Sequence, residues 1–96
     1  MTFTEFVDQL RERGLYERMQ QICRFQGVLL EEVFDLRGTG STRFARGRIW
    51  CWLVDDCHKT HSEVARMFGR KEMATVRDAV KTWRLRHKKP GMNLVP

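Results

Sequence analysis

Arginines and lysines are the residues of this chain whose spacing most clearly suggests a chemistry. Residues 66–89 contain nine Lys or Arg against two acids, and four more arginines lie between residues 37 and 48. Guanidinium and ammonium groups gathered in this way bind phosphate oxygens and displace counterions from a polyanion. The net charge of +6 is also segregated, because residues 1–36 carry 4 basic against 7 acidic side chains and residues 37–96 carry 14 against 5. This asymmetry favours nucleic acid as the partner.

The cysteines and histidines do not predict a second chemistry. Cys57 lies next to His58 and four residues before His61, but no second ligand pair has the spacing of a zinc finger. Three cysteines are an odd number, which favours reduced thiols that serve packing in a cytosolic chain. No nucleophile motif and no Gly-rich phosphate loop of the Walker type occurs. The sequence therefore predicts a protein that is not an enzyme and that uses no metal, cofactor or small-molecule substrate.

Length and hydropathy predict one domain in the cytoplasm, associated with the nucleoid. The 96 residues, 42% of them hydrophobic, suffice for one modest core, which we expect within residues 1–89, with a disordered tail over 90–96. No apolar run approaches the ~20 residues of a membrane-spanning helix. The first ten residues lack the basic and apolar regions of a signal peptide, so no membrane association is expected.

Helical periodicity runs through almost every segment and predicts an all-α bundle of about six helices. Thr2 and Glu5 form a possible capping box for a first helix that stops at Gly14. The second helix is expected to end at Gly27, and the third to span residues 30–36. The fourth should start at Ser41 or Thr42, the fifth at Thr60, and the last should span residues 71–86. The expected core-facing residues include Tyr16, Met19, Phe25, Val33, Phe34, Met73, Val76, Val80 and Trp83.

Trp50 and Trp52 lie in the central helix of this expected bundle. Residues two apart point to different faces of a helix, so the two tryptophans cannot both enter one core stripe. One of them is therefore expected to be partly exposed.

The last two expected helices are short and follow each other directly along the chain. The exposed side of the second one is basic. That pattern is typical of a helix-turn-helix, in which the second helix presents its first residues to the major groove of DNA. An ordinary helical hairpin with a solvated basic face has the same spacing, and the pattern alone leaves both open.

Residues 60–76, THSEVARMFGRKEMATV, resemble a known signature. They are similar to the C-terminal DNA-binding domain of the bacterial replication initiator DnaA, which reads roughly S-L-x-E-I-G-x-x-F-G-G-R-D-H-T-T-V. The positions in register are Thr60, Glu63, Val64, Phe68, Gly69, Lys71, Glu72, Thr75 and Val76. The resemblance covers roughly residues 19–84, leaves the first helix (within residues 1–18) unmatched, and implies a helix-turn-helix of the Trp-repressor-like kind.

Departures from the signature fall at its DNA-reading positions. The family's Asp-His-Thr reads bases after a phosphate-binding Arg, and those positions hold Glu72, Met73, Ala74 and Lys71 here. Gly40 aligns with the family's minor-groove arginine, so Arg37 or Arg43 would have to take its place. The resemblance therefore implies DNA binding without implying the family's own target site.

The residues and the resemblance together predict a small bacterial or phage protein that binds double-stranded DNA and regulates transcription or replication. The expected base contacts are Lys71, Glu72, Met73, Ala74 and Thr75. The expected phosphate or minor-groove contacts are Arg37, Arg43, Arg46, Arg48, Thr60, His61, Arg70, Arg77 and Lys81. The alternative is an interaction module that keeps the fold and binds an acidic partner or the initiator itself. In either case the acidic first helix could carry a homodimer or partner contact.

Overall fold

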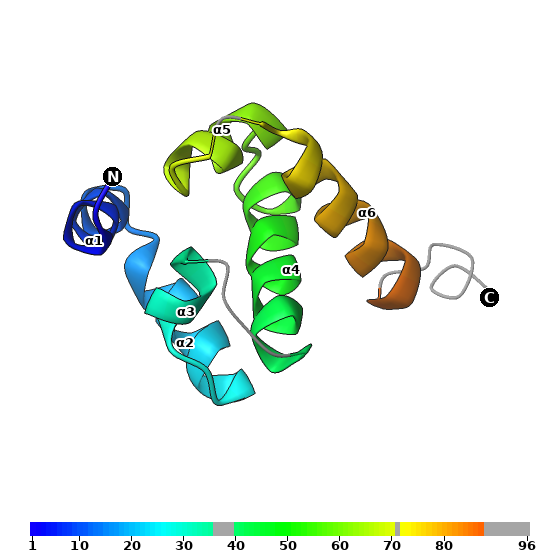
Figure 1. The fold of residues 1–96 in the computed structure, drawn as a ribbon, viewed down its shortest axis with the longest axis horizontal. Helices are drawn as coiled ribbons and strands as arrows, with labels where there is room; N and C mark the ends of the chain where they lie inside the picture. The colour runs from blue at the N-terminus through cyan, green and yellow to red at the C-terminus, as the bar shows by residue number, and fades with distance from the viewer. Residues whose placement is uncertain (36–39, 71, 88–96) are drawn as a thin grey trace.

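Six helices make up the regular structure of the described chain, as the sequence predicts (Figure 1). The structure is a computed structural model that describes residues 1–35, 40–70 and 72–87, and these ranges contain no strand. The helices are α1 (Phe3–Glu12), α2 (Tyr16–Gln26), α3 (Leu30–Phe34), α4 (Gly40–Asp55), α5 (His61–Met67) and α6 (Ala74–His87). None of the helices in these ranges has the length and apolar composition needed to cross a bilayer.

The expected helix caps are confirmed. The Thr2 hydroxyl accepts the Glu5 backbone N–H at 3.1 Å, and the Glu5 carboxylate accepts the Thr2 N–H at 2.7 Å. Thr60 and Glu63 form the same reciprocal pair at the start of α5, at 3.1 and 2.9 Å. Each pair satisfies two backbone donors that a helix start leaves without intrahelical partners.

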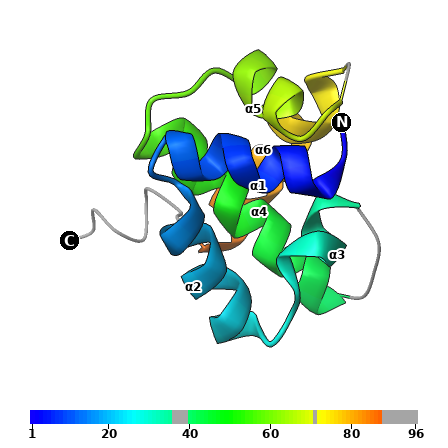
Figure 2. The same ribbon diagram turned by 90° about the vertical axis from the view of Figure 1, so that its left-hand side faces the viewer.

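Helix α4 is the centre of the bundle. Helix α6 packs along one side of it, α2 and α3 lie on the other side, and α5 covers one end (Figures 1 and 2). Helix α1 closes the gap between α3 and α5, since the Phe6 ring lies 4.7 Å from Phe34 and 4.8 Å from Phe68. All six helices therefore contribute to one core, and α6 keeps one long face open to solvent.

The two tryptophans of α4 behave as the periodicity predicts. Trp50 is fully buried and meets Phe68 edge to face at 5.5 Å, whereas Trp52 is half-buried. Cys23 and Cys51 are buried in the same core, and all three cysteines are free thiols. Burial raises the pKa of the Cys23 thiol to about 11, so this sulfur stays neutral and serves packing.

Phe25 was expected in the core, and the structure shows that this prediction is wrong. Its side chain is 78% exposed, because Met19, Ile22 and Cys23 fill the inward face of α2 and Phe25 lies two residues beyond Cys23. The Arg48 guanidinium carbon lies 5.5 Å from the centre of the Phe25 ring. An apolar ring is thus left on the surface with a cation beside it.

The expected start of the last helix is also wrong. Helix α6 begins at Ala74 rather than at residue 71, and it ends at His87, one residue later than expected. Met73 precedes the helix and is 43% exposed, so it does not join the buried Val76 and Val80. Trp83 packs against the core but is only partly buried.

Two other helix ends differ from the expected ones by small amounts. Helix α4 starts at Gly40, one or two residues early, and α3 ends at Phe34. Residues 36–39, 71 and 88–96, with the expected contacts Arg37 and Lys71 and the expected disordered tail, lie outside the described residues.

Candidate nucleic-acid interface

Helix α6 presents two exposed flanks on either side of its buried stripe. Thr75, Asp78 and Thr82 follow one another at helical spacing and line a groove against α4. Arg77 and Lys81 are exposed and lie outside that groove. The side chains of Arg77 and Lys81 make no hydrogen bond or ion pair with another described residue, so both cations are available to a phosphate backbone.

Arg46 forms a cluster of positive charge with Arg43 and Arg70, which lie near enough to act on its pKa. Arg43 and Arg46 come from the first half of α4 and line the α4–α6 groove, while Arg70 comes from the connection between α5 and α6. Burial and the positive charges of Arg43 and Arg70 lower the pKa of Arg46 from its ordinary value. Arg46 is therefore partly removed from solvent and has two further positive charges in its neighbourhood.

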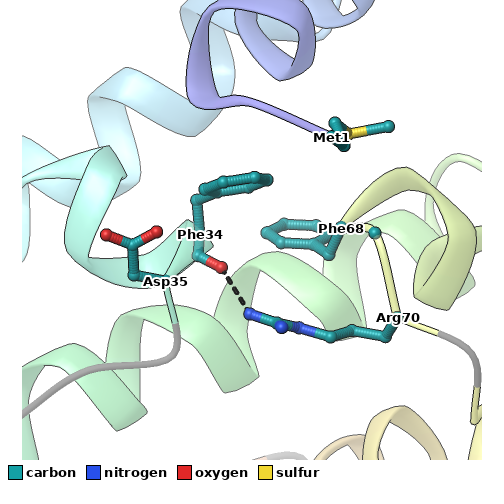
Figure 3. A pocket seen from close by; sticks show the side chains of 6 residues that line it. Met1, Phe34, Asp35, Phe68 and Arg70 are labelled. Atoms are coloured by element: carbon teal, nitrogen blue, oxygen red, sulfur yellow. Dashed lines mark hydrogen bonds between the residues drawn. The ribbon is translucent and has the colours of Figure 1, made fainter.

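Arg70 has a structural partner as well as a position in this cluster. Its Nη2 donates a hydrogen bond to the Phe34 carbonyl oxygen at 2.8 Å, at the end of α3 (Figure 3). Its Nε is buried and has no hydrogen-bond partner in the described part of the chain. Arg70 thus ties the α5–α6 connection to α3 and contributes positive charge from a fixed position.

The groove between α4 and α6 has a volume of about 440 Å³. Arg43, Arg46 and Thr75 lie along it, and the aromatic rings of Phe44, Trp83 and His87 also line it. Trp83 packs over Gly47, and a Cβ built there would be in ordinary contact with the Trp83 ring, at 3.5 Å.

The remaining expected phosphate contacts do not join this cluster. Arg48 lies on the α2 side of α4, over Phe25, and so is separated from Arg43 and Arg46 by the helix. The Thr60 hydroxyl caps α5, and His61 is the half-buried first residue of that helix. These three residues border other surfaces of the bundle.

The expected base-contact residues are divided by the start of α6. Glu72 and Met73 precede the helix, and the Met73 sulfur accepts a hydrogen bond from the Ser62 hydroxyl at 3.2 Å. Ala74 and Thr75 occupy the first turn, where Thr75 is exposed and Ala74 half-buried. Thr75 is therefore the expected base contact whose position on α6 fits that role most directly.

Several residues of this face were missed by sequence reasoning. Asp78, Thr82 and Arg86 line the groove beyond Thr75. Their spacing of three, four and four residues on one helix was the available signal. Arg84 forms an ion pair with Asp55 at the far end of α4, which raises the pKa of Arg84 and joins α6 to α4. No local pattern predicts that pairing.

The chain matches no known family model, no curated protein and no solved structure. A functional assignment therefore depends on the arginine cluster, the open face of α6 and the α4–α6 groove.

Proposed function

We propose that this protein binds double-stranded DNA through α6 and the arginines beside it. The observation that carries the proposal is that Arg43 and Arg46 line the groove beside the first turn of α6, with Arg46 partly desolvated and with Arg43 and Arg70 near enough to act on its charge. Guanidinium groups gathered in this way bind phosphate oxygens through paired N–H donors. Duplex DNA presents phosphates at regular intervals along its backbone, so several of these arginines can each contact one.

The shape of α6 supports the duplex as the ligand. Fourteen helical residues extend about 21 Å at 1.5 Å per residue. An α-helix fits the major groove of B-DNA, and exposed residues in the first turn of such a helix reach base edges. In this arrangement Thr75 contacts bases, while Arg43, Arg46 and Arg77 contact phosphates.

The resemblance to the DnaA domain supports the same geometry and a role in regulating bacterial or phage transcription or replication. The residues at the family's reading positions differ, however, since Met73 lacks the hydrogen-bonding groups of histidine and Ala74 offers only a methyl group. We therefore expect a target sequence distinct from that family's box.

Fluorescence anisotropy with a labelled duplex tests the proposal. Arg46→Ala should weaken binding to any duplex, whereas Arg24→Ala should leave it nearly unchanged. Arg24 is an exposed arginine of α2, and that helix lies on the opposite side of α4 from α6 (Figure 1). Both substitutions remove one positive charge, so equal losses would mean that binding depends on net charge and not on this face.

A protein-interaction module is the second candidate. Phe25 and Leu29 are 78% and 66% exposed at the end of α2 and in the following connection, which DNA binding does not explain. An acidic partner could use these side chains together with Arg48, which lies over Phe25. Competition distinguishes the two candidates, because unrelated duplex DNA should not displace a protein bound at the Phe25 surface.

A further inference from the structure

We propose that the α4–α6 groove binds a nucleoside monophosphate group, either as a free nucleotide or as an unpaired nucleotide of a single strand. The groove combines cations, an unpaired buried donor and an aromatic end within about 440 Å³. This volume lies in the range of small-ligand sites. The inference concerns a ligand other than the duplex and does not depend on duplex binding.

One part of the groove suits a phosphate. Arg43 and Arg46 lie one turn apart on α4, and the exposed Thr75 faces them from α6. Guanidinium groups bind phosphate oxygens through paired N–H donors, and a hydroxyl can add a further hydrogen bond. Asp78 is the one acid among the described lining residues, so the charge of the groove stays positive.

Trp50 gives a second and independent indication of a ligand. This residue lines the groove, is fully buried, and its indole Nε1–H has no hydrogen-bond partner within the described part of the chain. Buried donors are nearly always paired, since leaving one unpaired costs about 1–3 kcal/mol. The Arg46 guanidinium carbon lies 6.0 Å from the centre of the Trp50 ring. The Trp50 indole therefore lies beside the arginine that we propose to hold the phosphate.

The opposite part of the groove suits a planar ring. The centroids of Phe44 and Trp83 lie 4.7 Å apart, and those of Trp83 and His87 lie 4.0 Å apart. Phe44 and Trp83 are half-buried and His87 is exposed, so part of this cluster is accessible to a ligand. A nucleobase is the planar group that naturally accompanies a phosphate, and stacking on aromatic side chains does not depend on base identity.

The aromatic cluster also explains why the ligand is an unpaired or free nucleotide. In a duplex both faces of each base are covered by its neighbours, so a base must leave the stack before it can lie on a protein ring. The phosphates of a duplex can reach Arg43 and Arg46 from outside the groove, but its bases cannot reach Phe44 and Trp83. The same arginines can thus serve two ligands that exclude each other.

Isothermal titration of the full chain tests the inference with the four 5′-monophosphates, the nucleosides and inorganic phosphate. We expect the monophosphates to bind about tenfold more tightly than inorganic phosphate, as one base–aromatic stack would provide. Thr82→Trp should fill the groove and weaken this binding about tenfold. Leu85→Trp places the same side chain on the exposed face of α6 outside the groove, and should change the affinity less than about twofold. Circular dichroism verifies that both variants are folded. If Thr82→Trp does not fold, His87→Ala takes its place as the groove variant.

Short single-stranded oligonucleotides and the matching duplex form the remaining arms. Binding of single strands but not of mononucleotides, with the same sensitivity to Thr82→Trp, supports the groove as a site for an unpaired nucleotide. Inorganic phosphate binding as tightly as the nucleotides, or full binding by Thr82→Trp, would overturn the inference. Duplex binding without any nucleotide or single-strand binding also overturns it and leaves the proposed function intact. Nucleotide binding without duplex binding overturns only the proposed function.

Discussion

Arg46 differs from an ordinary surface arginine in its surroundings. It lies beside the buried Trp50 ring and close to two other arginines, so its charge is both partly desolvated and repelled. An arginine that only improved solubility would extend into water. Its position on α4, in the groove that faces α6, favours a role in holding an anion.

The arginines of the cluster should act on all duplexes alike. In the proposed complex Arg43→Ala and Arg46→Ala each remove one phosphate contact, so each should reduce the slope of log affinity against log salt by about one unit. Titrations on several unrelated duplexes measure this. A changed sequence preference with little loss of general affinity would show that the arginine reads a groove and does not contact phosphate.

The ionisation of Glu63 should make the free energy of unfolding depend on pH. Hydrogen bonds from Thr60 hold the pKa of this carboxyl below its ordinary value, so the folded state favours the ionised form. The stability contributed by this ionised group is present at neutral pH and is lost as the pH falls through its lowered pKa. Urea unfolding should therefore show that Glu63→Gln destabilises the protein at neutral pH, and that the difference from the parent shrinks in acid. A constant difference across pH would contradict this assignment.

At the scale of helices, the start of α6 decides which residues could reach the bases in the proposed DNA complex. Glu72 and Met73 precede the helix, so changes there act through the approach to the groove, whereas Ala74 and Thr75 act from the helix itself. Replacing Glu72, Met73 and Ala74 by Asp, His and Thr should preserve the fold and general affinity and move the preference toward the DnaA family's box. Each restored base contact should contribute about 1–3 kcal/mol of discrimination. Selection from random duplexes measures the shift, and identical preferences of two folded proteins would favour the interaction module.

Gly47 lies where α4 and α6 pack against each other. It lies inside a helix, where glycine costs about 1 kcal/mol relative to alanine, and a Cβ there would be in ordinary contact at 3.5 Å from Trp83. Gly47→Ala should therefore stabilise the protein by up to about 1 kcal/mol. Gly47→Leu should destabilise it, because the larger side chain would displace Trp83. Urea titration of both variants measures whether the free energy of unfolding rises with alanine and falls with leucine. Destabilisation by alanine would mean that the two helices are closer than described.

The helices themselves were predictable to the extent that their signals are local. The Thr2–Glu5 and Thr60–Glu63 boxes marked two helix starts, and residue spacing showed that Trp50 and Trp52 must differ in burial. Phe25 was misplaced because periodicity identifies a stripe and cannot tell whether Cys23 or Phe25 completes it. The start of α6 was misplaced because residues 70–73 lack a strong capping signal.

At the scale of the whole molecule, charge segregation along the chain predicted the basic half but not its geometry. Arg48 was grouped with Arg43 and Arg46 from sequence, yet it lies on the α2 side of α4. The Arg70–Phe34 and Arg84–Asp55 contacts join residues 36 and 29 positions apart, which no local pattern encodes. The groove between α4 and α6 depends on such long-range packing, and so its lining could not be derived from spacing alone.

The central claim is that α6 and the neighbouring arginines form a surface for duplex DNA. Anisotropy of an unrelated duplex across a salt series, with the parent and with the Arg43→Ala, Arg46→Ala double variant, tests it most directly. The account predicts tight binding by the parent at low salt, a steep loss as salt rises, and a slope shallower by about two units in the double variant. Absence of duplex binding by the folded parent at low salt, or an unchanged slope in the double variant, would contradict the account.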